Sequence, residues 1–159
     1  MTTGFQIAPA RAPADLAAVA ELFAGYAASL PVDLGYQDFD GELAALPGKY
    51  APPAGELFLA RDAAGAPLGC VGLRPLPDDG CCEMKRLFLL PAARGLGLGR
   101  ALTERVVDQA RRRGYRELRL DTLAGMTTAQ ALYEKRGFER IAPYYAPTPE
   151  GTVFMALKL

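Results

Sequence analysis

The sequence of 159 residues contains no histidine. This absence excludes a Ser-His-Asp or Cys-His nucleophile system, a histidine acid or base, and any metal site that needs a histidine ligand. The three cysteines, Cys70, Cys81 and Cys82, are an odd number and form no C-x-x-C pair. This argues against a disulfide framework and against a zinc site. We therefore expect no metal, and we expect the cysteines to be small buried side chains in a reducing compartment.

Long hydrophobic runs are also missing. No apolar stretch approaches the roughly 18 residues that a membrane-spanning helix needs. Residues 1–6 have neither the basic start nor the apolar run of a signal peptide. The length predicts one domain, residues 1–159, and the composition, 50% hydrophobic and 23% charged, is that of an ordinary globular domain. We expect a cytoplasmic protein that binds no membrane.

The net charge is zero, but the charges are unevenly distributed along the sequence. Residues 1–84 carry 4 basic and 11 acidic side chains, whereas residues 85–119 carry 10 basic and 3 acidic ones. A segment of 35 residues with a net charge of +7 predicts a local electropositive surface that suits a compact polyanion. The alternative is that these arginines lie on helix surfaces and are balanced by acidic neighbours in space.

Hydrophobic periodicity and turn residues divide the chain into strands and helices. Leu98, Leu102, Val106 and Ala110, for example, give one buried stripe of a helix. The expected strands cover residues 5–8, 56–61, 67–74, 81–90, 117–122, 138–141 and 152–159. The expected helices cover residues 14–30, 39–46, 98–113 and 126–136. This order predicts an α/β (α+β mixed) fold, with a single mixed, mostly antiparallel twisted sheet of about six or seven strands and helices on both faces.

One motif carries chemistry: Arg94-Gly95-Leu96-Gly97-Leu98-Gly99-Arg100, between an expected strand and an expected helix. Its alternate glycines let the backbone approach a ligand without clashes from Cβ atoms. The helix that follows offers free N–H groups and the positive end of its dipole to an anion. Arg94 and Arg100 can add charge-assisted hydrogen bonds to phosphate oxygens. The loop predicts a phosphate-binding site, and a glycine-rich turn with surface arginines is the alternative.

Two familiar phosphate-binding motifs do not match this loop. The P-loop pattern G-x-x-x-x-G-K-[ST] is absent. The dinucleotide pattern G-x-G-x-x-G fails because its third position falls on Arg100 or Leu102. Asp121 lies about 20 residues further on, as the dinucleotide fingerprint asks. A nucleotide-dependent oxidoreductase therefore stays as a less favoured alternative, although the chain is too short after the loop for the repeated halves of that fold.

Two motifs together point to a known family. Residues 94–99 read R-x-x-G-x-G after a hydrophobic strand, and residues 131–138 read Ala-Leu-Tyr-Glu-Lys-Arg-Gly-Phe. With these motifs the sequence resembles the GNAT superfamily of acyl-CoA-dependent N-acetyltransferases, most strongly over residues 81–140. The antiparallel front half and the late strand agree with the element order of that fold. The resemblance implies an N-acetyltransferase with acetyl-CoA as co-substrate, and it says little about the acceptor.

The resemblance also implies a cofactor site. In this family the strand before the loop diverges from its neighbour and pairs with the pantetheine amides, here through the backbone of Leu87, Phe88 and Leu89. The residues implied to hold the pyrophosphate are Arg94, Gly95, Leu96, Gly97, Leu98, Gly99 and Arg100. Gln130 and Arg136, on the late helix, are implied to contact the cofactor as well. The net charge of +7 fits a ligand with a pyrophosphate and a 3′-phosphate.

Two residues are candidates for proton transfer. Tyr133 matches the family's usual general acid, and a phenol with a pKa near 10 suits a thiol leaving group. The alternative for Tyr133 is a core aromatic. Glu83 matches a position that is often acidic in the family, and with a pKa of about 4.3 it would act as base through water or after burial. The alternative for Glu83 is a surface glutamate paired with Lys85 or Arg86.

The acceptor is expected to be the primary amine of a small molecule that attacks directly in a ternary complex. Lys85, Arg86 and Arg74 favour a carboxylate-bearing amine such as an amino acid. The acceptor site should be formed by the first two helices, the loop at 47–55 and the segment at 144–145.

Other functions and partners are left open to different degrees. A non-catalytic CoA-binding or regulatory domain is the main alternative function. A protein-lysine substrate stays open, and so does a homodimer through the sheet edge or the late strand. Nucleic acid is not expected, because the run of three arginines at 111–113 has no aromatic platform beside it.

Overall fold

A computed structural model describes residues 4–159, so the first half of the segment searched for a signal peptide, residues 1–3, lies outside the described residues. The strands are β1 (Phe5–Pro9), β2 (Glu56–Asp62), β3 (Pro67–Pro75), β4 (Cys81–Leu89), β5 (Glu117–Thr122), β6 (Glu139–Ile141) and β7 (Val153–Lys158). The α-helices are α1 (Pro13–Ser29), α2 (Phe39–Ala44), α3 (Leu98–Arg112) and α4 (Thr127–Arg136). Three short 3₁₀ helices are η1 (Leu34–Gln37), η2 (Gly48–Tyr50) and η3 (Pro91–Ala93).

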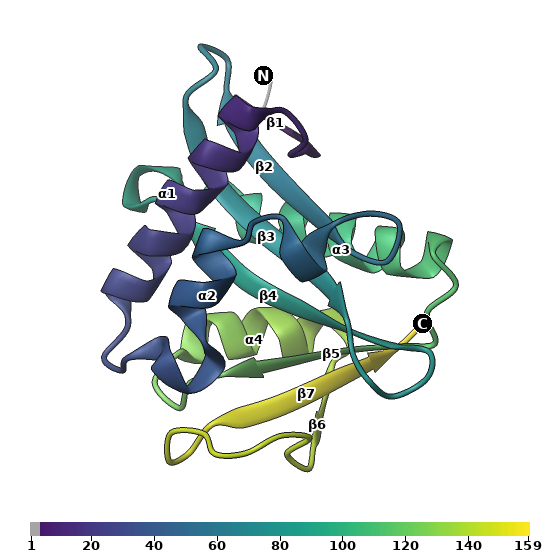
Figure 1. Ribbon diagram of the computed structural model, residues 1–159. Helices are drawn as coiled ribbons and strands as arrows, with labels where there is room; N and C mark the ends of the chain where they lie inside the picture. Colours follow the sequence, from purple (N-terminus) through teal and green to yellow (C-terminus); the bar gives the residue numbers. More distant parts are fainter. Residues whose placement is uncertain (1–3) are drawn as a thin grey trace.

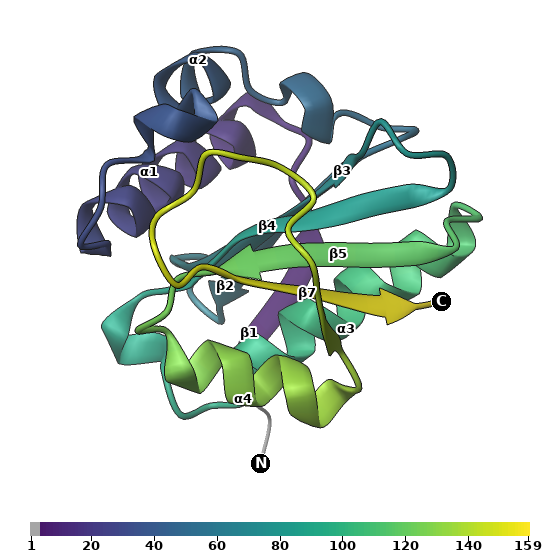
Figure 2. The same cartoon turned by 90° about the horizontal axis from the view of Figure 1, so that it is seen from below.

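The strands form one 7-stranded sheet in the order β1-β2-β3-β4-β5-β7-β6. The central pair β4–β5 is parallel and is connected through α3, and the other neighbouring strands are antiparallel. Helices α1 and α2 cover one face and α3 and α4 the other (Figure 1, Figure 2). The predicted fold class, a mixed and mostly antiparallel sheet with helices on both faces, is confirmed.

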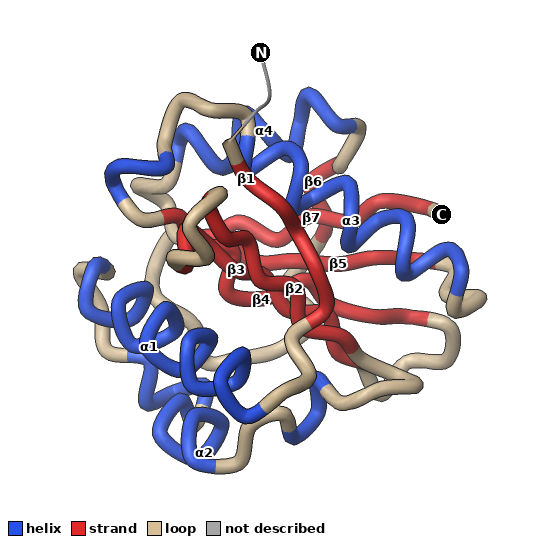
Figure 3. Tube along the Cα trace, turned by 90° about the horizontal axis from the view of Figure 1, so that it is seen from above, coloured by secondary structure: helices blue, strands red, loops and turns tan. Residues whose placement is uncertain are grey.

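A hydrophobic core fills each face of the sheet. On the α3 face, Leu98, Leu102, Val106 and Ala110 are each 0% exposed, which confirms the predicted stripe. On the α1 face the core contains Val19 and Phe23 together with side chains of β2 and β3. Figure 3 shows the sheet between the two helical layers. The three cysteines are free and buried, as expected.

The central strand β4 contains a bulge that shapes the functional site. Gly72 of β3 pairs with Lys85, but Cys70 pairs with Phe88, so β4 contains an extra residue between the two pairs. Arg86 there has a φ of 61°, which is rare for a non-glycine residue. β4 pairs with β5 only over Cys81, Cys82 and Glu83. Beyond Glu83 the two strands diverge, because a bulge bends and twists its strand.

The boundaries differ from the predicted ones by one or two residues, with one physical reason visible at α2. The expected helix 39–46 ends at Ala44, because Leu46 precedes Pro47 and the residue before a proline avoids the helical region. The short helix η1 was not predicted, and it begins where the Asp33 carboxylate accepts a hydrogen bond from the Gly35 N–H at 2.6 Å. No helix in residues 4–159 is both long enough and apolar enough to span a membrane.

Candidate active site

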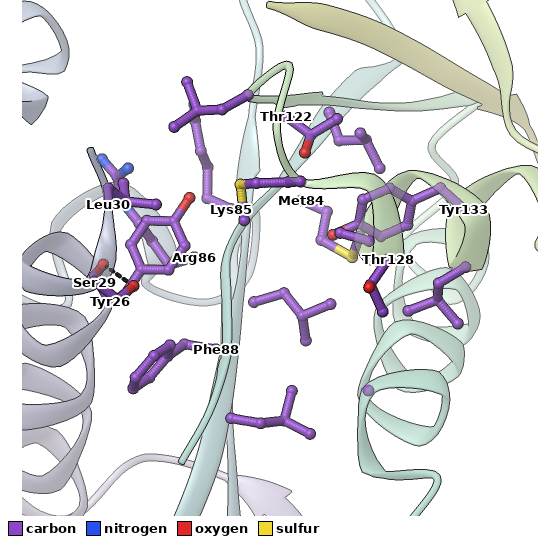
Figure 4. A pocket seen from close by; sticks show the side chains of 18 of the residues that line it. Tyr26, Ser29, Leu30, Met84, Lys85, Arg86, Phe88, Thr122, Thr128 and Tyr133 are labelled. Carbon is purple, nitrogen blue, oxygen red and sulfur yellow. Dashed lines mark hydrogen bonds between the residues drawn. The ribbon is translucent and has the colours of Figure 1, made fainter. Parts of the chain in front are cut away.

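A cleft of about 540 Å³ opens where β4 and β5 diverge (Figure 4). Helix α1 forms one side of it with Tyr26 and Ser29, and α4 forms the other with Tyr133. Because β5 no longer pairs with β4 beyond Glu83, this edge of β4 presents backbone N–H and C=O groups to the cleft. An extended ligand with amide groups can therefore pair with β4 as a neighbouring strand would.

Most of the predicted cofactor residues line this cleft. Those that do are Leu87, Phe88, Leu89, Arg94, Gly95, Gly97, Leu98, Gly99 and Arg100. Three predicted residues do not. Leu96 is 51% exposed at the tip of the loop. Gln130 donates a hydrogen bond to the Leu123 carbonyl at 2.9 Å, and Arg136 forms an ion pair with Glu104 of α3, so both side chains are held away from the cleft.

The glycine loop, which the sequence predicts to bind phosphate, lies at one end of the cleft. Gly95 and Gly97 have φ values of 82° and 77°, a region that glycine enters without strain. The first bond of α3 runs from the Ala101 N–H to the Gly97 carbonyl, which leaves the preceding N–H groups without helical partners. Within the described part of the chain, no carboxylate lies within ion-pair distance of Arg94 or Arg100. We call Arg94, the loop glycines, Arg100 and the first turn of α3 the phosphate end of the cleft.

Tyr133 lies on the cleft wall opposite β4. Its side chain is 6% exposed and packs against the Phe138 ring at a centroid distance of 5.7 Å. Burial raises the pKa of Tyr133 above its ordinary value of 10.0, and the charge of Asp121 adds to this. Its hydroxyl therefore stays protonated at neutral pH, and it makes no hydrogen bond to any group in residues 4–159.

A second cavity, also of about 540 Å³, lies on the α2 side of the sheet and contains Glu83. Glu83 is 1% exposed rather than on the surface. It accepts hydrogen bonds from Arg74 Nε at 2.8 Å and from the Tyr144 hydroxyl at 2.5 Å. Tyr36, Gln37 and Lys85 line both cavities and form the wall between them. Glu83 thus lines the second cavity and not the cleft.

The wall is part of a buried network of charges. Lys85 Nζ lies 2.9 Å from Asp121 Oδ1 and 3.7 Å from Glu83 Oε2. Tyr145 donates to Asp121 and accepts from Gln37 at 2.8 Å. Burial alone would raise the pKa of Asp121, but the Lys85 charge and the hydrogen bonds from Tyr145 and Lys85 hold it below 3.8. We call this set of residues the polar network: Gln37, Glu83, Lys85, Asp121, Tyr144 and Tyr145.

The three basic residues that favoured a carboxylate-bearing acceptor already have partners. Lys85 pairs with Asp121, Arg74 with Glu83, and Arg86 with Glu42 at 3.0 Å. Arg86 also lies over the Phe39 ring at 5.2 Å, which ties α2 to the bulge. In the basic segment at 85–119, five of the ten basic residues have a carboxylate at ion-pair distance within residues 4–159, so its charge is balanced only in part: Lys85, Arg86, Arg112, Arg113 and Arg119. At the phosphate end Arg94 and Arg100 keep the positive charge that the segment predicted.

Several lining residues had no local signal in the sequence. Tyr26, Ser29 and Gln37 reach the site only because α1 and η1 pack over β4. Tyr144 and Tyr145, in the connection between β6 and β7, line the second cavity, as does Lys49. That connection passes over the edge of the sheet toward α2 (Figure 2).

One further residue did leave a signal in the sequence. The inward positions of β5 read Leu118, Leu120, Thr122. Thr122 carries a hydroxyl at an inward position where the alternation predicts an apolar side chain.

Comparisons with known proteins agree with this geometry. Residues 20–138 match the model of the Acetyltransferase (GNAT) family. An uncharacterized N-acetyltransferase of Schizosaccharomyces pombe is 38% identical over 157 residues, which are 99% of this chain and 96% of that protein. The N-acetylaspartate synthetase of Danio rerio is 32% identical over 120 residues, 74% of this chain and 43% of that protein.

A solved structure gives the same fold with a ligand present. An acetyltransferase from Salmonella typhimurium, determined with its cofactor acetyl-CoA, superposes with a TM-score of 0.74 at 21% identity, covering 98% of this chain and 94% of that one. The family match, the nearly full-length relative and the fold lead to one conclusion. This chain belongs to the GNAT family of acetyltransferases and is an N-acetyltransferase by descent.

Proposed function

We propose that this protein, acting as one domain, transfers an acetyl group from acetyl-CoA to the primary amine of a small molecule that carries a carboxylate. One observation carries the proposal: the cleft between β4 and β5 has cations without carboxylate partners at one end and a protonated phenol at the other. An elongated, polyanionic thioester fits this polarity. Bound acetyl-CoA supplies the acyl group and the thiol leaving group.

The residues of the cleft match the parts of that ligand. Arg94, Arg100 and the N–H groups at the start of α3 would hold the phosphates. The free edge of β4 at Leu87, Phe88 and Leu89 would pair with the pantetheine amides. Both contacts use backbone groups that lack strand or helix partners, so binding satisfies groups that water alone solvates in the free protein.

Tyr133 is the proposed general acid. Its hydroxyl holds a proton at the cleft wall, and the raised pKa keeps that proton in place until a thiolate forms beside it. No protein acceptor competes for the hydroxyl within residues 4–159. A positioned acid of this kind contributes about 10²- to 10⁴-fold to a rate.

Glu83 is the proposed proton acceptor, working through Tyr144. The Tyr144 hydroxyl already donates to Glu83 at 2.5 Å and lines the second cavity. The amine would give its proton to Tyr144 Oη while Tyr144 gives its own proton to the Glu83 carboxylate. The phenol ends as it began, and the proton resides on Glu83.

Lys49 is the proposed partner of the acceptor carboxylate. It lines the second cavity, and within residues 4–159 no carboxylate lies at ion-pair distance from it. The name of the Danio rerio relative supports this choice, because N-acetylaspartate is an acetylated amine with carboxylates. The cavity also contains Arg74 and Arg119, whose charges are shared with Glu83 and Asp78.

The test measures release of the CoA thiol from acetyl-CoA in the presence of paired amines, such as alanine and ethylamine, that differ in one carboxylate. We expect transfer to the carboxylate-bearing member of each pair, with KM raised about 5-fold or more in Lys49→Ala and kcat nearly unchanged. Glu83→Gln keeps the shape and one acceptor oxygen, so it can accept from either Arg74 or Tyr144 but not from both. It cannot take a proton, so its rate should fall about 100-fold.

Three outcomes would contradict the proposal. Equal rates for the two amines of each pair would show that the acceptor needs no carboxylate. A wild-type rate in Glu83→Gln would exclude the proposed proton transfer through Tyr144 to Glu83. Tight acetyl-CoA binding without transfer to any amine would leave the non-catalytic CoA-binding domain as the better account.

A further inference from the structure

The cleft contains a buried hydroxyl that nothing in the protein binds. Thr122, the last residue of β5, is 6% exposed. Its Oγ1 is shielded from solvent and has no hydrogen-bond partner within residues 4–159. A buried hydroxyl without a partner is costly, so native structures rarely keep one. Thr122 lines the cleft, which makes a ligand the natural partner.

The position of Thr122 along the cleft indicates which part of a ligand it meets. The phosphate end lies beyond Leu89, whereas Met84 stands five residues earlier on β4, on the other side of the bulge at Arg86. In Figure 4 the side chains of Thr122, Met84 and Tyr133 lie at the same end of the cleft, away from Phe88. A ligand with phosphates at one end and a thioester at the other therefore brings its acyl group to Thr122.

The side chains at this end of the cleft indicate that the partner of the Thr122 hydroxyl is an oxygen atom that accepts a hydrogen bond. Met84 is apolar and 3% exposed, and Tyr133 is the other buried hydroxyl residue labelled there in Figure 4. Thr128 also lies at this end, but it is exposed, so water can solvate its hydroxyl. Tyr133 faces the sulfur in the proposed function, on which this inference rests. The polar atom left on the acyl group is its carbonyl oxygen, which accepts but does not donate, and a threonine hydroxyl supplies one donor.

We infer that the Thr122 hydroxyl donates a hydrogen bond to the carbonyl oxygen of the bound acyl thioester. Thr122 is then the residue by which the protein distinguishes acetyl-CoA from free CoA, since free CoA has no oxygen at that place. The hydroxyl is unpartnered in the ligand-free protein because its partner arrives with the substrate.

The test compares the Kd of acetyl-CoA with the Kd of free CoA by titration calorimetry, in the wild type, Thr122→Val and Thr122→Ser. The two ligands share phosphates and pantetheine, so the ratio of their Kd values isolates the acyl contact. We expect Thr122→Val to bind acetyl-CoA about 5- to 10-fold more weakly and free CoA within about 2-fold of the wild type. Thr122→Ser should restore the ratio.

The melting temperature of the ligand-free protein gives an independent readout. Valine matches threonine in shape and removes a hydroxyl without a partner, so Thr122→Val should melt at or above the wild-type temperature. Thr103 is the matched control: it is 1% exposed, donates to the Gly99 carbonyl at 2.8 Å, and does not line the cleft. Thr103→Val should melt lower and leave the Kd ratio unchanged.

The outcomes separate this inference from the proposed function. If the wild type binds neither ligand, the proposed function fails and Thr122 fails with it. If the wild type binds both and Thr122→Val keeps the wild-type ratio, only the Thr122 inference is overturned. A lower melting temperature for Thr122→Val than for the wild type would also overturn it, because the hydroxyl would then have a partner in the free protein.

Discussion

The phosphate end of the cleft and the polar network are both rich in charge, but they use it differently. Arg94 and Arg100 have no carboxylate partner within the described residues, and the N–H groups beside them lack helical partners. In the polar network Lys85 is 4% exposed and pairs with two carboxylates. The first region keeps its positive charge for the anion that we propose binds there, whereas the charges of the second region are already paired within the protein.

The role of a charged side chain therefore depends on whether it has a partner of opposite charge in the folded protein, and not on its place in the sequence. Lys85 and Arg94 belong to the same basic segment. A buried pair contributes mainly when a partner is removed, since an isolated buried charge is costly. A cation at a helix N-terminus contributes only when a phosphate binds. The five predictions below test this difference and the cleft beside it, from the largest expected effect to the smallest.

Removing the Asp121 charge should have the largest effect on stability. Asp121→Asn leaves Lys85 buried with only the more distant Glu83, so we expect a loss of about 3 kcal/mol in the free energy of unfolding, measured by urea titration. Asp108→Asn is the control, because Asp108 pairs with Arg112 on the exposed face of α3 and should cost less than about 0.5 kcal/mol. Equal losses would contradict the distinction between the two regions.

The same residue predicts a pH dependence. The folded pKa of Asp121 lies below its ordinary value of 3.8. Its stabilisation is therefore complete above that pH and is lost as the pH falls through the lower, folded value. Asp121→Asn should flatten this part of the curve of stability against pH.

Removing the Tyr133 hydroxyl should affect turnover without affecting binding. In Tyr133→Phe we expect kcat to fall about 100-fold and the Kd of acetyl-CoA to stay within about 2-fold, since the hydroxyl has no protein partner to lose. Tyr115→Phe removes a hydroxyl that donates to the Ala54 carbonyl away from the cleft and should leave kcat unchanged. A Tyr133→Phe enzyme with wild-type kcat would exclude Tyr133 as the acid.

Removing a cation from the phosphate end should affect binding without affecting stability. Arg94→Ala and Arg100→Ala should each weaken acetyl-CoA binding about 5-fold at low salt and less at high salt. Arg111→Ala is the control, because Arg111 is exposed near the other end of α3 and does not line the cleft. A change in melting temperature in either cleft variant would show that the cation has a structural partner after all.

Alanine substitutions at two glycines of the loop, Gly97 and Gly99, should affect stability differently. Gly97 has a φ of 77°, so Gly97→Ala should destabilise the protein by about 1 kcal/mol. A Cβ on Gly99 would meet Leu132 and Leu89 at an ordinary 3.7 Å, so Gly99→Ala should fold as well as the wild type. If phosphate passes close to Gly99, that variant will bind acetyl-CoA a few-fold more weakly. Wild-type affinity for acetyl-CoA in Gly99→Ala would show that the ligand does not need a glycine at this position, and that the loop needs glycine only where φ is positive.

The sequence predicted the elements, and the place of the glycine loop directly before α3, because both depend on local patterns. The hydrophobic periodicity of residues 98–110 predicts α3, and the alternate glycines directly before it can be recognised from neighbouring residues alone. The bulge at Arg86 had no such signal, since an arginine at positive φ is held there by Glu42 and Gln37, more than 40 residues away. Arg136 likewise turns away from the cleft because of a distant partner, Glu104. Gln130 turns away because of a local one, the Leu123 carbonyl seven residues before it.

The measurement that tests the central claim most directly is calorimetric titration with acetyl-CoA, and with NADH as competitor, in the wild type and an Arg94→Ala/Arg100→Ala double variant. The account predicts micromolar binding of acetyl-CoA to the wild type, at least about 10-fold weaker binding to the double variant, and none of NADH. Unchanged affinity in the double variant, or binding of NADH in place of acetyl-CoA, would contradict it.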